Sequence, residues 1–321
     1  MSIEKHDKTR MLWEEVFSDD TKKFLDYYYA TVAKSNQIYI VEEDEAIQSM
    51  LHLNPYPTYI DGQERLVNYI VGVATRSSYR KRGYMEAMLR LSLQHMYQNK
   101  EPFTFLMPAA EAIYAPYDFV TVSGQTHYEY QGEKDRQGVP IVAKYELDLA
   151  TTDNCEELAA IGEEKLASKY RVCTKRDTNY YNRLVKEQTC QNGGIVLIRK
   201  SGVLEGYFLI ANEGYLQVRE PVMKKETIKL ETLLNLQLKA TPKIMIRIVN
   251  LLELLNLTGF KPGFKPGLGV EIEVVDPILI ENTGVYVMTN TMRGVFWNKV
   301  TDKISERSAI SIADLTKQIF P

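Results

Sequence analysis

A short basic loop, Arg80-Lys81-Arg82-Gly83, lies between an apolar run and a helical pattern. The apolar run, residues 65–75, is long enough to be a buried strand. After the glycine, Met85, Met88, Leu89, Ser92 and Met96 follow one another at helical spacing. Backbone N–H groups at a helix start are unpaired and partly positive, and glycine lets a ligand approach the backbone. The loop, with Arg76 as a further cation, suits a pyrophosphate, although most basic loops of this kind are simply solvated.

The elements that must position this loop alternate helix and strand patterns. Aromatic residues at helical spacing predict a helix over Trp13–Ala30, and two strands are expected at Gln37–Glu42 and Ala46–Leu53. A short strand at Phe103–Met107 and a short helix at Ala110–Tyr114 follow the loop and its helix. The predicted order is therefore a helix, a meander of strands, and then a strand, the basic loop, a helix and a strand.

The middle of the chain repeats only the opening of this order. A strand is expected at Val142–Leu149, followed by helices at Asn154–Tyr170 and Asp177–Lys186, with Asp177 as the N-cap of the second. Three further strands form a predicted meander, and their ranges are Gly194–Arg199, Val203–Ala211 and Tyr215–Val222. No second basic loop and helix follow them.

The last part of the chain begins at Pro242. The spacing of Met245, Ile248, Leu251, Leu252 and Leu255 predicts an amphipathic helix over Ile244–Leu257. Strands at Val270–Val275 and Val285–Asn290 and a final helix at Ile312–Ile319 are expected after it.

Composition excludes several classes of protein. The 321 residues include 39 basic and 42 acidic side chains, a balance of −3 that argues against nucleic acid as a partner. No apolar stretch approaches the roughly 20 residues of a membrane span, and the charged N-terminus does not resemble a signal peptide. Three cysteines without paired spacing fit a reducing compartment, so a cytoplasmic protein is expected. The four histidines are scattered, so no metal site is expected.

The strand, Arg-x-x-Gly loop and helix, followed by Phe105-Leu106-Met107-Pro108 and Tyr114, resemble the GNAT N-acetyltransferases. More closely, the segment from Leu106 to Phe119 resembles the Ile-Tyr-x-x-(Phe/Tyr)-Gly-(Phe/Tyr) pattern of the enhanced intracellular survival (Eis) branch. Three C-terminal segments also resemble that branch, in the same order: Met245-Ile246-Arg247-Ile248-Val249, Asp276 to Gly284, and Ser311-Ile312-Ala313-Asp314-Leu315.

The resemblance implies an α+β protein of three modules. These are an N-terminal GNAT domain with a mixed sheet flanked by helices (1–135), a shortened central GNAT-like domain (136–240) and a sterol-carrier-like C-terminal α/β domain (241–321). The central module should not bind CoA, because it lacks the second half of the GNAT pattern. Three departures are visible: Asp118 where the pattern favours Gly, Met85 where most GNAT loops have Gly or Ala, and Val249-Asn250 in place of Val-Asp.

The resemblance also implies acetyl-CoA as cosubstrate and assigns the site residues. Cofactor binding is expected from the strand end and the loop: Val73, Ala74, Thr75, Arg80, Lys81, Arg82, Gly83 and Tyr84. A phenol with a pKa near about 10 can protonate a thiolate, so Tyr114 is the expected acid. The alternative is that Tyr114 is one of 21 tyrosines packed on a short helix. The expected base is the C-terminal carboxylate of Pro321, unless the last residues only pack the terminal helix.

The implied activity is N-acetyl transfer to a primary amine, either a lysine or a small polyamine- or aminoglycoside-like molecule. Candidates for an acidic acceptor pocket are Asp19, Asp20 and the run Glu42-Glu43-Asp44-Glu45, although acidic runs are usually solvated. The resemblance also implies a homo-oligomer, with a hexamer as in relatives of the branch, and no membrane partner. The alternative function is a non-catalytic, oligomeric protein that binds CoA or a lipid, with a groove lined by the predicted helix at Ile244–Leu257.

Overall fold

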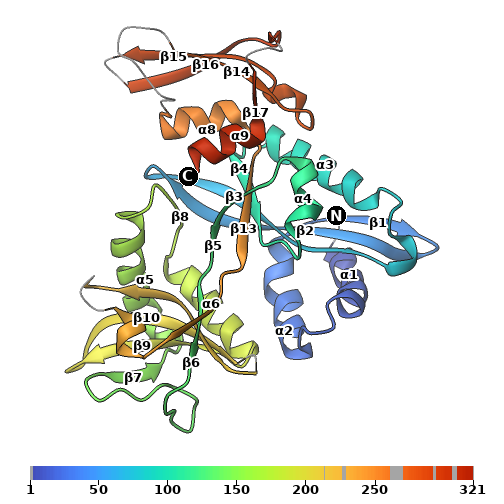
Figure 1. The fold of residues 1–321 in the computed structure, drawn as a ribbon. Coiled ribbons are helices and arrows are strands. Elements are labelled where there is room, and N and C mark those ends of the chain that lie inside the picture. Colours follow the sequence, from blue (N-terminus) through green and yellow to red (C-terminus); the bar gives the residue numbers. More distant parts are fainter. Residues whose placement is uncertain are drawn as a thin grey trace. The chain divides into compact units, whose positions relative to one another are not determined.

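The computed structural model describes residues 3–212, 214–225, 229–260, 270–291, 294–305 and 309–320 (Figure 1). The chain forms two compact units. The first combines Met1–Ser18, Ala33–Ser123 and Lys243–Pro321, and the second combines Asp19–Val32 and Gly124–Pro242. Helices and sheets occur in both, so the α+β class predicted from the sequence is confirmed. None of the helices in these ranges is long and apolar enough to cross a lipid bilayer.

The main sheet of the first unit is mixed. Its strands lie side by side in the order β1 (Gln37–Glu43), β2 (Ala46–Ile60), β3 (Gln63–Thr75), β4 (Phe103–Leu106), β13 (Lys243–Ile248) and β5 (Val120–Gly124). β1, β2 and β3 are antiparallel neighbours, whereas β3 and β4 are parallel and are joined through helix α3 (Tyr84–Gln98). The predicted strand–loop–helix–strand unit is therefore present, with Gly83 as the N-cap of α3.

Strand β13 brings a distant part of the chain into this sheet, between β4 and β5 (Figure 1). It pairs antiparallel with β4, so that Met245 faces Leu106 and Ile248 faces Phe103. The expected single helix over Ile244–Leu257 is therefore wrong. Residues 243–248 alternate β-branched isoleucines with other side chains and pair with β4, and the helix α8 (Leu251–Thr258) begins only where the Asn250 side chain accepts the N–H of Glu253.

The predicted helix over Trp13–Ala30 is also wrong, because two helices replace it. Helix α1 (Ile3–Val16) belongs to the first unit, and α2 (Lys22–Tyr27) belongs to the second. Thr21 has extended backbone angles, and its hydroxyl accepts the N–H of Phe24, which starts a new helix. The π-helical turn η1 (Tyr28–Val32) and the 3₁₀ turn η2 (Ala33–Ser35) then lead to β1.

Two helices cover the strands that carry the candidate site. The buried side chains Met88, Leu89, Leu93 and Met96 of α3 form one core with Leu51, Leu53, Ile70, Leu106 and Tyr114. On α1, Trp13 packs on Gly72 of β3, where φ is +60° and an added Cβ would lie 2.4 Å from the Trp13 ring. The glycine therefore allows both the positive φ and the close approach of α1.

The C-terminal part of the first unit has its own small sheet. Its strands lie in the order β16 (Gly294–Thr301), β15 (Gly284–Thr291), β14 (Val270–Val275) and β17 (Ile310–Ser311). The 3₁₀ turn η7 (Ile280–Asn282) precedes β15, and helix α9 (Ile312–Ile319) follows β17. The expected start of the last helix is confirmed, because the Ser311 hydroxyl accepts the N–H of Asp314.

The second unit contains one sheet in the order β12 (Gln237–Ala240), β6 (His127–Tyr130), β11 (Leu216–Met223), β10 (Val203–Asn212), β9 (Gly194–Lys200) and β7 (Glu146–Leu149). Asp177 caps helix α6 as predicted, and β9, β10 and β11 form the predicted meander. The other elements are η5 (Thr152–Asn154), α5 (Cys155–Gly162), η6 (Glu163–Ala167), β8 (Val172–Thr174), α6 (Thr178–Cys190) and α7 (Leu230–Leu233).

Candidate active site

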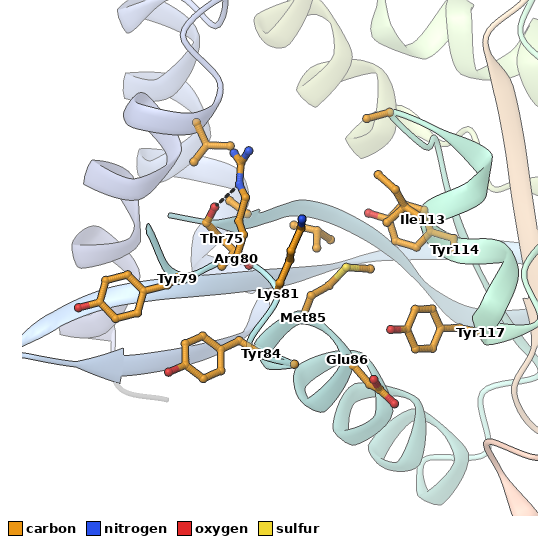
Figure 2. Close-up of a pocket in the computed structure, with 15 residues that line it drawn as sticks. Thr75, Tyr79, Arg80, Lys81, Tyr84, Met85, Glu86, Ile113, Tyr114 and Tyr117 are labelled. Atoms are coloured by element: carbon orange, nitrogen blue, oxygen red, sulfur yellow. Dashed lines mark hydrogen bonds between the residues drawn. The ribbon is translucent and has the colours of Figure 1, made fainter. Parts of the chain in front are cut away.

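A cavity of about 550 Å³ lies where β3 ends and α3 begins (Figure 2). The helix α4 (Glu111–Tyr114) and the 3₁₀ turn η4 (Ala115–Tyr117) line its other side. The cavity brings together most of the residues predicted from the sequence: Val73, Ala74, Thr75, Arg80, Lys81, Gly83, Tyr84 and Tyr114. Arg82, although also predicted, does not line it. Met85, one of the departures from the GNAT pattern, contributes its side chain to the wall.

The last residues of β3 present an open backbone edge to this cavity. On one side β2 holds them: the Ser49 hydroxyl donates to the Ala74 carbonyl at 2.9 Å and lies 2.6 Å from the Thr75 hydroxyl. On the other side, β3 pairs with β4 at Tyr69 and Phe105, and no later pairing of these two strands occurs in the described part of the chain. Main-chain groups at the end of β3 are therefore available to an extended ligand.

The loop between β3 and α3 is anchored to the turn between β1 and β2. The Tyr79 hydroxyl donates to Asp44 Oδ2 at 2.8 Å, and the Tyr84 hydroxyl donates to Glu43. The Arg82 guanidinium lies 4.4 Å from the centre of the Tyr79 ring and 3.9 Å from Glu43 Oε1. Two members of the acidic run thus fix the loop, and Arg82 is used in the same contact instead of lining the cavity.

The remaining cations of the loop differ in their contacts. Arg76 donates to Glu15 at 2.9 Å, and Arg80 Nε donates to the Thr75 carbonyl at 3.2 Å (Figure 2). Lys81 has a φ of +64°, its ammonium points into the cavity, and it makes no ion pair or hydrogen bond within the described ranges (Figure 2). Because no side chain caps α3 at Gly83, the first N–H groups of the helix remain available to an anion.

Tyr114 is the buried hydroxyl of the site. Its side chain is 8% exposed, and its ring packs against Phe119 with the ring centres 5.9 Å apart. Figure 2 shows the hydroxyls of Tyr114 and Tyr117 both directed into the cavity from the same wall. Burial raises the pKa of Tyr114 to about 12, so the hydroxyl is protonated at neutral pH. It can therefore donate a hydrogen bond to a group in the cavity.

Sequence reasoning missed the contact that holds the segment carrying Tyr114. The Arg247 side chain, on β13, is wholly buried and donates from Nε to the Tyr117 carbonyl at 2.8 Å. Asp118, the departure from glycine, adopts the left-handed conformation that the pattern's glycine would take, with φ at +62°. The sequence signal for such a contact is a single arginine within an apolar run, because a buried arginine needs polar partners.

The proposed base lies outside the described residues, because these end at Phe320. The Phe320 ring packs edge to face against Phe103 at the start of β4, with the ring centres 5.1 Å apart. The end of α9 therefore lies against the main sheet of the first unit.

Comparisons with known proteins agree with this geometry. Residues 1–122 match the family model described as an acetyltransferase (GNAT) domain. No curated protein matches the sequence of the chain.

Solved structures share the fold over nearly the whole chain. One is a conserved protein of unknown function from Enterococcus faecalis V583, described as a probable N-acyltransferase (TM-score 0.74, 16% identity, 99% of this chain and 87% of that chain). Another is a GCN5-related N-acetyltransferase from Anabaena variabilis (TM-score 0.71, 16% identity, 98% and 87%). A third is Eis1 from Mycobacterium abscessus (TM-score 0.67, 13% identity, 100% and 88%). At these identities the similarity shows the fold.

The family match confirms the prediction of an acetyltransferase of the GNAT type. All the residues that line the cavity lie within the part of the chain that the match covers. Arg247, which contacts the segment that carries Tyr114, lies outside that part. Residues 1–122 of this chain are thus similar to the acetyltransferase (GNAT) domain family.

Proposed function

We propose that the protein transfers an acetyl group from acetyl-CoA to a primary amine. The observation that carries this proposal is the cavity between the open end of β3, the uncapped start of α3 and the Tyr114 hydroxyl. It combines an anion site, an exposed strand edge and a buried proton donor, which are the three features that a thioester of a nucleotide cofactor needs.

The loop residues are proposed to bind the pyrophosphate. The N–H groups at the start of α3 and the Lys81 ammonium face the cavity, and Gly83 leaves the backbone accessible there. Arg80 would add a second charge by exchanging its contact with the Thr75 carbonyl for one with the phosphate. The main chain of Val73 and Thr75 would then hold the pantetheine arm and polarise the thioester carbonyl.

Tyr114 is proposed to stabilise the leaving thiolate. A free thiol has a pKa near about 8.5, whereas burial places that of Tyr114 at about 12. The phenol is therefore the weaker acid, so its main contribution would be a hydrogen bond to the sulfur as negative charge develops there. Such a donor is worth roughly 10²–10³ in rate when the site excludes water.

The C-terminal carboxylate of Pro321 is the proposed base for the amine. This assignment rests on analogy with the Eis branch; the described chain ends at Phe320, whose ring contacts Phe103 at the start of β4. Adding a long C-terminal tag should abolish turnover and leave the affinity for acetyl-CoA intact. An unchanged rate in the tagged protein would exclude this carboxylate as the base.

The finer features are proposed by analogy with the Eis branch. They are the acceptor class (a lysine or a polyamine- or aminoglycoside-like amine), a homo-oligomer, the three-module division and a sterol-carrier-like third module.

The three cysteines are free thiols, which supports a cytoplasmic location.

Titration with acetyl-CoA tests the activity. We expect calorimetry to detect binding to the native protein and at least about tenfold weaker binding to Arg80→Ala, which loses a phosphate contact. Tyr114→Phe should bind normally and lose about 10²-fold or more in kcat.

Two outcomes would argue for other functions. Binding of acetyl-CoA without turnover with any amine would favour the non-catalytic CoA-binding alternative. Absence of acetyl-CoA binding by the native protein would exclude the proposed activity.

A further inference from the structure

Arg247 joins the C-terminal part of the chain to the backbone beside Tyr114. Its guanidinium is completely buried and makes three short hydrogen bonds: Nε to the Tyr117 carbonyl (2.8 Å), Nη1 to the Ile248 carbonyl (2.6 Å) and Nη2 to Asp276 Oδ1 (2.7 Å). The bond to Tyr117 spans 130 residues of sequence. A buried arginine so bonded has one geometry, because its planar fork fixes the directions of its donors.

Asp276 is held equally firmly on the other side. It is completely buried, and its Oδ1 also accepts the N–H groups of Ile278 and Leu279, both at 2.9 Å. Its Oδ2 accepts from Asn282 Nδ2 at 3.0 Å, and the same nitrogen donates to the Val249 carbonyl at 2.9 Å. The ion pair therefore belongs to a hydrogen-bonded frame formed by β13, its continuation and the turn at 276–283.

The frame acts on a segment with few regular hydrogen bonds of its own. The Tyr117 carbonyl ends the single 3₁₀ turn η4, and the next residue, Asp118, has a φ of +62°. Tyr114, which directly precedes this turn, and Tyr117, its last residue, both line the cavity. The direction of both hydroxyls thus depends on the position of a turn that Arg247 holds by its carbonyl.

An ion pair alone does not account for this arrangement. Buried ion pairs commonly add little stability compared with apolar side chains, because desolvating the charges is costly. Arg247 and Asp276 already neutralise each other, whereas the Nε bond to Tyr117 is directed at the segment of the site.

We propose that Arg247 is a positioning residue for Tyr114, through which the C-terminal part of the chain sets the geometry of the proton donor. This inference rests on the proposed function. Arg247 does not line the cavity, so it acts through the Tyr117 carbonyl and not on a ligand.

A double-mutant cycle tests the proposal. Arg247→Met combined with Asp276→Asn removes both charges of the ion pair together and leaves the Asp118 carboxylate, whose Oδ2 lies 3.9 Å from Arg247 Nη2, as a remaining charge beside the site. Arg247→Lys is a second variant that keeps the positive charge and loses the fork. We expect either change to lower kcat at least about tenfold and to leave the affinity for acetyl-CoA within about twofold. In the Tyr114→Phe background the same changes should alter kcat by less than about twofold, because the residue through which Arg247 acts is already absent.

A matched control distinguishes positioning from a general loss of structure. Arg65→Met breaks another contact between early and late parts of the first unit, the Arg65 Nε–Glu253 Oε1 pair at 3.2 Å, and should leave kcat unchanged. Hydrogen exchange should rise at residues 111–118 in the Arg247 variants and remain native at residues 84–98.

Each unfavourable outcome has its own meaning. An equal fold-loss of kcat with and without Tyr114 would overturn the positioning role, and so would native kcat in the Arg247 variants. A native protein that does not turn over acetyl-CoA, or a Tyr114→Phe variant with native kcat, would overturn the proposed function itself and the positioning role with it.

Discussion

Glu101 shows how burial changes the chemistry of one side chain in this protein. It precedes β4, is 6% exposed, and accepts hydrogen bonds from the Asn68 side chain at 2.8 and 2.9 Å and from the Asn68 backbone at 3.3 Å. These bonds favour the carboxylate, but burial favours the neutral acid more strongly, so the pKa rises from 4.5 to about 7. Folding therefore favours uptake of a proton in the neutral range.

This shift predicts a pH-dependent stability. The folded pKa exceeds the unfolded value, so the contribution of Glu101 is complete below about pH 4.5 and is lost as pH rises through 7. The loss should amount to roughly 3 kcal/mol by pH 8. Glu101→Gln cannot ionise, so its Tm relative to the native protein should increase between pH 5 and pH 8.

Thermal denaturation of both proteins across this range measures the difference. Glu64→Gln, which replaces an exposed carboxylate on β3, serves as the control. A difference for Glu101→Gln that stays constant with pH would contradict the raised pKa.

The sequence predicted residues best where function and local structure require the same residue type. Gly83 starts α3 as expected, and Tyr114 and most of the loop line one cavity. The contacts of Arg82, which was assigned to cofactor binding, and of Arg247 could not be predicted, because they are made with residues distant in sequence: Glu43 on β1 for Arg82, and Tyr117 and Asp276 for Arg247. Spacing along the chain carries no information on such partners.

At the scale of elements, the turn between β1 and β2 holds the loop that is proposed to bind the pyrophosphate. The hydroxyls of Tyr79 and Tyr84 donate to Asp44 and Glu43, and both rings line the cavity. Their hydrogen bonds restrict the loop to fewer conformations before a ligand binds, so less conformational entropy is lost on binding.

Removing both hydroxyls should therefore weaken cofactor binding. Tyr79→Phe combined with Tyr84→Phe loses both hydrogen bonds, and we expect the Kd for acetyl-CoA to rise about fivefold or more. The Tm should change little, because both residues are at the surface. Calorimetric titration measures the Kd, and Tyr128→Phe, which removes a similar bond to Glu231 in the second unit, is the control. A native Kd in the double variant would show that the loop needs no such anchor.

Elements were predicted well where their ends carry local signals. Asp177 caps the helix that it was expected to cap, and Ser311 caps the last helix at its expected start, because capping depends on residues within one turn. The segments 13–30 and 244–257 were assigned wrongly for the opposite reason. Their apolar residues continue at helical spacing across the boundary between two elements. Only the caps at Thr21 and Asn250 and the pairing of β13 with β4 show where the new element starts.

For the molecule as a whole, the family match ends at residue 122, but the sheet of the matched region also contains a strand from later in the chain. Strand β13, from residues 243–248, lies between β4 and β5, and its Arg247 and the Asp276 frame hold the segment of Tyr114. The alternation of isoleucines with other residues in β13 is visible in the sequence. Its place in the sheet depends on pairing with β4, which lies about 140 residues earlier in the chain.

The chain truncated after residue 242 should therefore not form a working acetyltransferase domain. Without β13, β4 loses one of its two neighbours and β5 loses its neighbour in this sheet, so both expose unpaired backbone groups, which favours aggregation. The Tyr117 carbonyl also loses its donor. We expect an insoluble fragment, or a soluble one without acetyl-CoA binding, and at least partial recovery when residues 243–321 are co-expressed as a separate chain that can supply β13. Solubility on co-purification and calorimetry measure both effects. A soluble fragment 1–242 with native affinity for acetyl-CoA would show that the N-terminal domain is complete without the strand.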